Sequence, residues 1–276
     1  MKRYLAFVCL AALLSSCSGS DEPELADMPV IEAWIDSDGH PTVLFTSAII
    51  PDADGGDLVD RMIRWGKVTI SDGEREVIMT GTRDSRYFPP YRYFSYDIFG
   101  EPGKTYTVTA KYRELYASAT CRMLEPTKIG RITFAPAENN DTLCSTTLHF
   151  TAPQDVPAYY YLTIREPGKS VVSQPAMLGC KEVVEAGAQV TIPVFDSKQT
   201  RKGEPFVAQL RRGHTYAVSL HRVPKAVYDF WRAYDDAIMF SENLMIGANG
   251  SLPGNVSGGF GIFGARGTDT MTFTVE

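Results

Sequence analysis

Residues 101–108 read Glu-Pro-Gly-Lys-Thr-Tyr-Thr-Val, a turn that leads directly into a strand. Pro102 and Gly103 favour a turn, because proline presets φ and glycine accepts a positive φ. Apolar and polar side chains then alternate from 105 to 112, which is the period of a strand with one buried face. We expect a β-strand here, with the ring of Tyr106 packed at the end of a core and its phenol hydrogen-bonded back to the chain.

Strand-like runs of the same kind flank this segment. Turn residues separate them, such as the Asp72-Gly73 step of a hairpin. The strands predicted in the first half are 29–35, 42–47, 67–71, 76–80, 93–98, 105–112 and 116–123. About seven strands in roughly a hundred residues is typical of an immunoglobulin-like sandwich. Segment 101–108 also resembles the strand start of fibronectin type III domains, where a tyrosine closes the corner between two sheets.

The second half is β-rich but less regular. Its candidate strands are 142–151, 159–165, 190–196, 206–210 and 215–222. The Gly-x-Thr-Tyr pattern of residues 103–106 recurs at Gly213 to Tyr216. Two β domains of similar plan would produce this repeat, and a pattern this short also recurs by chance. One amphipathic helix is predicted near 224–240, because Pro224 suits a first helical position and apolar residues follow at helical spacing. We expect the aromatic stripe of this helix to pack across a sheet.

The predicted fold class is therefore mainly β. An N-terminal immunoglobulin or fibronectin III-like sandwich is expected at 28–125, and a second β-rich domain with the helix at 126–276. The boundary is placed at Glu125-Pro126-Thr127, where the strand pattern breaks.

The first residues are typical of a secretory signal. Lys2 and Arg3 precede an apolar run at 4–14, which is too short to span a bilayer as a helix. Leu14-Ser15-Ser16-Cys17 resembles the bacterial lipobox, in which the cysteine receives a diacylglyceryl group before cleavage. Residues 1–16 are thus expected to be a lipoprotein signal peptide, with Cys17 as the lipidation site and the anchor to the outer membrane.

Residues 17–27 form an acidic, flexible tether in this interpretation, because they are too polar to pack into a core. The stretch resembles the surface-export signal of Bacteroidota lipoproteins, which would place the protein on the cell-surface face. A simple solvated linker explains the same composition.

Charge and cysteine content exclude several classes of function. A net charge of −6 and a pI near 5.3 argue against a nucleic-acid partner, which requires clustered Lys and Arg. Cys121, Cys144 and Cys180 allow at most one intrachain disulfide, and their spacing does not match a zinc site. Cys121 shares an alternating face with apolar residues, so we expect it to be buried as a small hydrophobe.

Residues 258–265 read Gly-Gly-Phe-Gly-Ile-Phe-Gly-Ala. They resemble the closing motif of a Bacteroidota outer-membrane lipoprotein family known as domain of unknown function forty-two forty-nine. Segments 30–35, 102–106, 228–234 and 243–255 take the places of the family's upstream features. The resemblance implies a surface-exposed lipoprotein encoded near TonB-dependent receptors, with no assigned catalytic residues.

The expected function is accordingly that of an accessory binding or structural subunit of a TonB-dependent nutrient-uptake system, with an unknown extracellular ligand. The alternatives are a hydrolase that acts on an extracellular polymer and an adhesin or surface-assembly component. No catalytic residue, metal or cofactor is assigned, and we do not expect an enzyme.

Two patterns that resemble chemical motifs have simpler explanations, and the histidines match no motif. Gly259, Gly261 and Gly264 match G-x-G-x-x-G, but no helix and acidic residue can follow at the required spacing, so close backbone packing is preferred. An acidic loop has no calcium ligand at the twelfth position and is interpreted as solvated; its residues are Asp52, Asp54 and Asp57. The histidines match no hydrolase or metalloprotease motif; they are His40, His149, His214 and His221.

An aromatic segment around Pro89-Pro90 is the candidate contact site for a ligand or partner. Its residues are Tyr87, Phe88, Tyr91, Arg92 and Tyr93. Two prolines hold the loop stiff, so part of its aromatic surface is expected to stay exposed and to stack on a sugar, a peptide or a protein. Packing between domains explains the same residues equally well.

Overall fold

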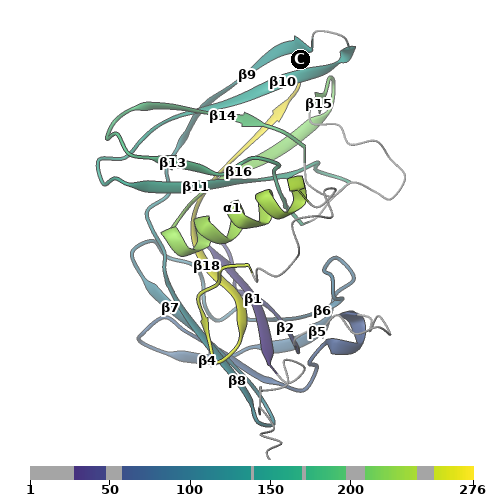
Figure 1. Ribbon diagram of the computed structural model, residues 1–276, viewed down its shortest axis with the longest axis vertical. Coiled ribbons are helices and arrows are strands. Elements are labelled where there is room, and N and C mark those ends of the chain that lie inside the picture. The colour runs from purple at the N-terminus through teal and green to yellow at the C-terminus, as the bar shows by residue number, and fades with distance from the viewer. Residues whose placement is uncertain (1–27, 48–57, 138–139, 170–171, 197–208, 241–251) are drawn as a thin grey trace, which may run out of the picture.

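The structure, a computed structural model, describes residues 28–47, 58–137, 140–169, 172–196, 209–240 and 252–276 (Figure 1). Within these ranges the protein is mainly β and contains one α-helix, α1 (Lys225–Phe240), and one short 3-10 helix, η2 (Leu58–Arg61). The predicted combination of β-rich halves with one helix is confirmed. Among the described helices, none has both the length and the apolar character needed to cross a membrane.

The strands of the described residues form three sheets. The largest has nine strands. Eight of them follow in the order β12 (Gln174–Pro175), β11 (Ala158–Arg165), β16 (Thr215–Val223), β18 (Phe260–Thr274), β1 (Pro29–Asp36), β2 (Thr42–Ser47), β6 (Tyr91–Phe94), β5 (Thr80–Arg83). The ninth, β13 (Lys181–Val183), pairs with β11 beside β12. The second sheet contains β14 (Gln189–Val194), β10 (Asn140–Thr151), β15 (Leu210–Arg211) and β9 (Ile129–Ala137). The third contains β17 (Val256–Ser257), β8 (Leu115–Arg122), β7 (Thr105–Tyr112), β3 (Lys67–Ser71) and β4 (Glu76–Ile78).

The two smaller sheets cover the same face of the nine-stranded sheet. Successive side chains of a strand point to opposite faces, so odd-numbered residues of β18 share one face. Of these, Ala265 is buried in the core beneath the five-stranded sheet, and Met271 and Phe273 pack on the core beneath the four-stranded sheet. Each half of the large sheet thus forms a sandwich with one small sheet, and the two sandwiches stand end to end (Figure 1).

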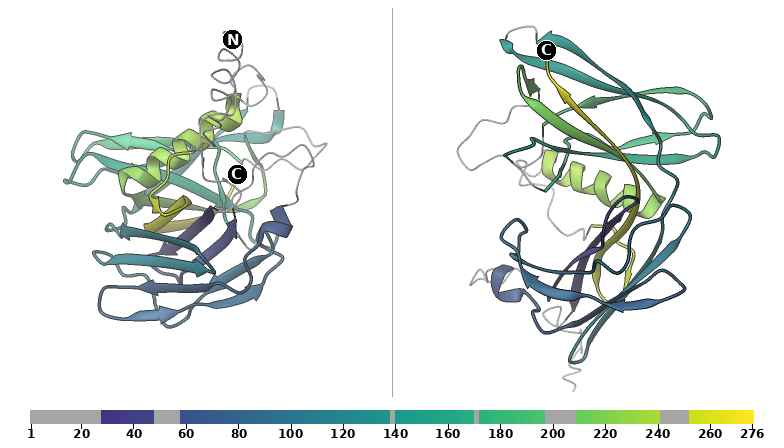
Figure 2. Two further views of the ribbon diagram at one scale, coloured as in Figure 1. Left: turned by 60° about the horizontal axis from the view of Figure 1, so that its bottom comes forward. Right: turned by 180° about the vertical axis from the view of Figure 1, so that it is seen from behind.

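Strand β18 belongs to both sandwiches. Its first part runs parallel to β1, with Ile35 opposite Ala265, and its second part runs antiparallel to β16, with Val218 opposite Met271. The strand crosses the waist of the molecule as one continuous ribbon in the rear view (Figure 2, right). The proposed boundary near Glu125 falls between β8 and β9, while residues 256–266, assigned to the second domain from sequence, pair with β8 and β1.

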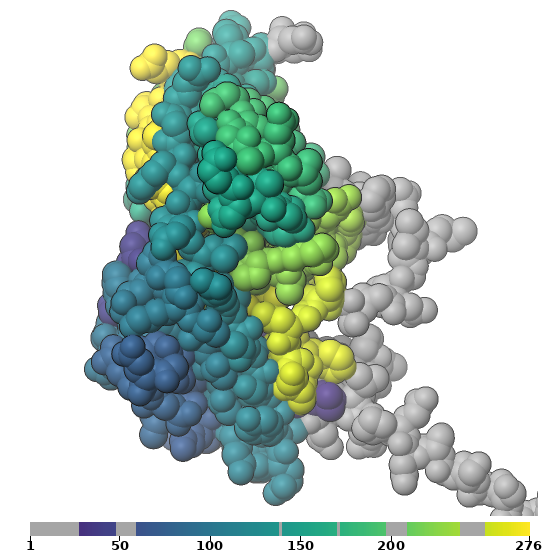
Figure 3. Space-filling view, turned by 90° about the vertical axis from the view of Figure 1, so that its left-hand side faces the viewer, coloured from purple at the N-terminus to yellow at the C-terminus, as the bar shows by residue number. Residues whose placement is uncertain are grey.

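Helix α1 covers the middle of the opposite face of the large sheet. Val227 is fully buried and the indole of Trp231 is 8% exposed, while Lys225 and Asp229 pair on the outer side. Figure 3 shows α1 wedged in the waist between the two sandwiches. The prediction that the aromatic stripe packs on a sheet is confirmed.

The corner tyrosine predicted at 106 is present, and it is present twice. The Tyr106 phenol accepts a hydrogen bond from Glu101 N (2.8 Å) and donates to Phe99 O (3.1 Å). In the second half, the Tyr216 phenol accepts from Arg211 N at 3.2 Å, also five residues upstream. Gly103 and Gly213, each three residues before its tyrosine, both have positive φ, at 85° and 77°. The assignment of either half to the immunoglobulin or fibronectin III fold remains a prediction.

Candidate functional site

Strand β6 separates the predicted aromatic residues into two groups. Because the direction of side chains alternates along a strand, Tyr91 and Tyr93 point to one side and Arg92 and Phe94 to the other. The two groups have different surroundings and different roles.

Tyr91 and Tyr93 hold the segment that precedes β3. The buried Tyr93 phenol donates to Ile63 O at 2.8 Å and accepts from Gly66 N at 3.0 Å, and burial raises its pKa to about 12. The Tyr91 phenol donates to Arg64 O at 3.0 Å. These two residues therefore fix the main chain at 63–66.

Arg92 lies between two aromatic rings on the other side of the strand. Its guanidinium is 5.1 Å from the ring centroid of Tyr87 and 4.8 Å from that of Phe94. Its Nε donates to Asp84 at 2.9 Å and Nη1 to Thr42 Oγ1 at 3.3 Å. Asp84 is itself fixed, because hydrogen bonds from Arg86 and then from Arg92 hold the pKa of its carboxyl well below the usual range. The cation–π stack is therefore held in one geometry.

The stack continues as a chain of ring contacts. The ring centroids of Phe94 and Tyr96 are 5.1 Å apart, those of Tyr96 and His40 5.0 Å, and those of His40 and Phe99 5.2 Å. Each pair of rings is nearly edge to face. The Ile98 carbonyl can only accept, so His40 donates to it from Nδ1 (3.0 Å). Among these rings, Tyr96 is 71% exposed and Phe99 46%.

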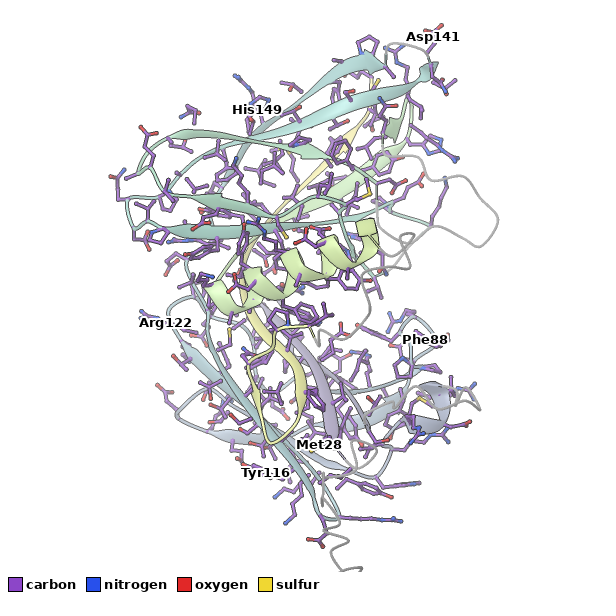
Figure 4. All side chains as sticks on the ribbon, viewed as in Figure 1. Met28, Phe88, Tyr116, Arg122, Asp141 and His149 are labelled. Atoms are coloured by element: carbon purple, nitrogen blue, oxygen red, sulfur yellow. The ribbon has the colours of Figure 1, made fainter. Side chains whose placement is uncertain are left out.

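We call this patch the aromatic surface. It consists of the residues in contact, with the exposed sequence neighbour of Tyr87 added: His40, Tyr87, Phe88, Arg92, Phe94, Tyr96 and Phe99. Phe88 is 67% exposed and lies in the β5–β6 connection (Figure 4). Of the five residues predicted from the sequence, Tyr87, Phe88 and Arg92 belong to the patch, and Tyr91 and Tyr93 support the neighbouring segment. Phe94 ends the aromatic segment recognised in the sequence but was not among its predicted contact residues, and Tyr96 was missed, although both continue the period of two from Arg92.

A second polar and aromatic group, the junction cluster, lies beneath α1 and joins the two sandwiches. It consists of Trp34, Asp36, Tyr161, His221, Trp231, Arg266 and Thr268. Arg266 donates to both carboxylate oxygens of Asp36 at 2.6 Å and to the Tyr161 phenol at 2.9 Å. Trp231 stacks on Trp34 and Tyr161 with ring centroids 5.5 and 5.2 Å apart.

His221 is the buried titratable group of this cluster. Thr268 Oγ1 donates its proton to Asp36, so His221 donates from Nδ1 to Thr268 (2.9 Å) and accepts at Nε2 from Thr163 (2.8 Å). Burial, aided by Arg266 and opposed by Asp36, lowers the pKa of His221 to about 3. A neutral ring with both nitrogens satisfied fits a structural role.

The other histidines lie apart from one another. His149 shares a hydrogen bond of 2.8 Å with Thr133 across two strands, and His214 lies 2.7 Å from a carboxylate oxygen of Glu166. Within the described ranges, no three His, Cys, Asp or Glu side chains gather closely enough to hold a metal ion. The acidic loop residues Asp52, Asp54 and Asp57 and the predicted lipidation site Cys17 lie outside the described residues.

The G-x-G-x-x-G pattern begins one residue before strand β18 and continues into it, and the expected close packing is confirmed. A Cβ on Gly261 would lie 1.9 Å from Ile31 O, and one on Gly264 would lie 2.4 Å from the Trp34 ring. Cys121 is a buried free thiol, as predicted, whose Sγ accepts from Ala265 N at 3.2 Å. Burial raises its pKa to about 11, which keeps it protonated and unreactive.

No protein-family model matches this chain, and a search of curated proteins finds no similar one. The candidate site therefore rests on the geometry described above.

Proposed function

We propose that this protein is a lipid-anchored accessory subunit of a TonB-dependent nutrient-uptake system on the outer membrane, and that it contacts its receptor through the aromatic surface. The observation that carries this proposal is the row of ring contacts that begins at the fixed Arg92 and ends in the exposed rings of Tyr96 and Phe99. Aromatic residues and arginine dominate the binding energy of protein interfaces. Rings that are already held in place lose little conformational entropy on binding.

The lipid anchor and the cell-surface location are part of the same proposal. Their support is the basic, apolar and small-residue order that ends at Cys17, followed by the acidic stretch. The likeness of residues 258–265 to the lipoprotein family supports the uptake role.

The test is recovery of a receptor from outer membranes. The tagged full chain is expressed in its host, the membranes are solubilised, and copurified proteins are identified by mass spectrometry. We expect a TonB-dependent receptor with the wild type and at least about tenfold less with Phe88→Ala/Tyr96→Ala, because truncation of a hot-spot residue costs about 2 kcal/mol or more.

Tyr116→Ala/Ile78→Ala is the matched control, because these side chains are also exposed, at 52% and 64%, but lie outside the aromatic surface. It should recover as much receptor as the wild type. Recovery of fimbrial or other assembly proteins instead, or equal losses in both double variants, would contradict the proposal.

A further inference from the structure

A pocket in the first sandwich, lined by none of the residues of the aromatic surface, has the features of a second binding site. Its volume is about 650 Å³, within the usual range of small-molecule sites. One wall is the segment 59–65 between β2 and β3, and the other is the turn between β7 and β8.

The first wall is rigid. Ile63 N donates to Phe45 O at 2.9 Å, and the phenols of Tyr93 and Tyr91 donate to Ile63 O and Arg64 O. Side chains on this segment are therefore presented from a fixed main chain, as a preformed site requires.

Three arginines line the pocket, and none of them is neutralised by a described carboxylate. Arg61, Arg64 and Arg113 form no ion pair with any residue in the described part of the chain. The Arg113 guanidinium lies 5.1 Å from the ring centroid of Tyr112, which leaves its N–H donors available at the pocket. Two acidic residues, Asp60 and Glu114, also line it, so the lining carries a formal charge of +1 in a chain of net charge −6. Guanidinium groups bind carboxylates through paired hydrogen bonds.

Arg113 occupies a position that glycine would fill at lower cost. Tyr112 pairs with Leu115, so Arg113 is the first of two residues in a tight hairpin turn, and its φ is +53°. An L-residue at this φ costs roughly 1–2 kcal/mol. Such outliers concentrate at functional sites, and here the outlier places a guanidinium at the pocket.

Trp65 supplies an apolar platform beside these cations. Its side chain is 86% exposed, the largest exposure among the large hydrophobic side chains of the described residues. A bare indole face stacks on the apolar face of a flat ring, and the polar atoms of the ligand then remain free to meet the arginines.

We propose that this pocket binds a carboxylate-bearing sugar residue of an extracellular polysaccharide. Such a residue has a ring that can cover Trp65 and a carboxylate that can pair with Arg64 and Arg113. The site uses no residue of the aromatic surface, so the proposal goes beyond the proposed receptor contact and is tested separately.

The experiment is calorimetric titration of the purified full chain with a trimer of galacturonic acid at pH 7 and low salt. We expect binding that weakens as salt rises, because ion pairing at a solvent-accessible site is screened. The methyl-esterified trimer has the same rings without the charge and should bind at least about tenfold more weakly, as should a triglutamate peptide, which has carboxylates but no sugar ring.

Variants locate the site. Arg64→Ala and Trp65→Ala should each weaken binding of the acidic trimer about tenfold or more without changing the melting temperature, because both side chains are exposed. Arg113→Gly should weaken binding and raise the melting temperature, because it relieves the turn. Arg131→Ala, at an exposed arginine on β9, and Phe88→Ala/Tyr96→Ala should leave the affinity unchanged.

The inference is overturned if the acidic trimer does not bind, if the ester or the peptide binds as tightly, or if Arg64→Ala and Arg131→Ala behave alike. Failure of receptor recovery would leave these results unaffected, since the two tests use different variants and probes.

Discussion

Asp36 and Arg266 lie opposite each other where β1 runs parallel to β18, and two nitrogen–oxygen contacts of 2.6 Å join their side chains. The residues are 230 positions apart in the sequence, and the Arg266 side chain is only 15% exposed. Loss of one partner would leave a largely desolvated charge without compensation. The pair therefore stabilises the junction of the two sandwiches.

Asp36→Ala is expected to lower the free energy of unfolding by about 2–3 kcal/mol, somewhat less than for a fully buried pair, because Asp36 is 30% exposed. Urea denaturation measures the loss. Asp229→Ala removes the exposed pair with Lys225 and should cost less than about 0.5 kcal/mol. Equal losses in the two variants would show that the Asp36–Arg266 pair is no stronger than a surface contact.

Stability should fall as the pH drops from 6.5 toward 3, through the protonation of His221. The unfolded chain takes up the proton near its ordinary pKa of 6.5, whereas the folded protein resists until about 3. The unfolded state thus binds more protons in this window, and acid favours it. At pH 5 the expected cost is about 2 kcal/mol relative to pH 7.5.

Urea titrations at both pH values measure this slope. His221→Gln, which cannot titrate, should lose most of it, and His149→Gln on the surface should retain it. A slope that survives in His221→Gln would assign the acid sensitivity to other groups.

Tyr106→Phe and Tyr216→Phe should destabilise the protein by similar amounts, about 1–2 kcal/mol each. Both changes leave a main-chain N–H without its phenol oxygen, and both tyrosines are at most 2% exposed. Thermal denaturation checks this, with Tyr116→Phe as the control because its side chain is 52% exposed. A loss in only one of the two would show that the corners are not equivalent.

Gly261→Ala should destabilise the protein by more than about 3 kcal/mol or prevent folding, since the new methyl group meets the main chain of β1. Gly73→Ala separates this steric effect from the cost of positive φ, because Gly73 has φ +90° but no atom within 4 Å of the added carbon. Its expected cost is about 1 kcal/mol. Soluble expression and urea denaturation compare the two.

Cys17→Ser is expected to shift the protein from the membrane fraction to the soluble fraction, because a hydroxyl does not accept the lipid group. Fractionation followed by immunoblotting measures the distribution, and Cys180→Ser serves as the cysteine control that should stay with the membrane. Retention of Cys17→Ser in the membrane would contradict the anchor.

Local patterns predicted several strands with the correct bounds, but the strand expected at 93–98 is instead β6 (Tyr91–Phe94), and pairings between distant segments could not be predicted. Strands 42–47, 67–71 and 105–112 have the bounds expected from alternation. β9 and β18 were not identified as strands, because β9 exposes residues on both faces and the glycines of β18 conceal its alternation. Nothing local specifies that Ile35 lies beside Ala265, since register between remote strands is set by packing.

The candidate site shows the same division. Aromatic composition was sufficient to find Tyr87, Phe88 and Arg92, but His40 joins them only through the fold, from the turn between β1 and β2. No sequence pattern indicated the pocket arginines, because Arg64 and Arg113 become neighbours only when the β7–β8 turn folds beside the segment before β3.

The path of β18 has a consequence for biogenesis. As the polypeptide leaves the ribosome, residues 260–274 follow every other described strand, yet each sandwich needs them to complete its part of the large sheet. Until β18 is made, the edges of β1 and β16 that it covers have no strand to pair with. Closure of both halves then becomes a single late event, and a chain that stops short of this strand offers proteases two unfinished halves rather than one finished and one missing.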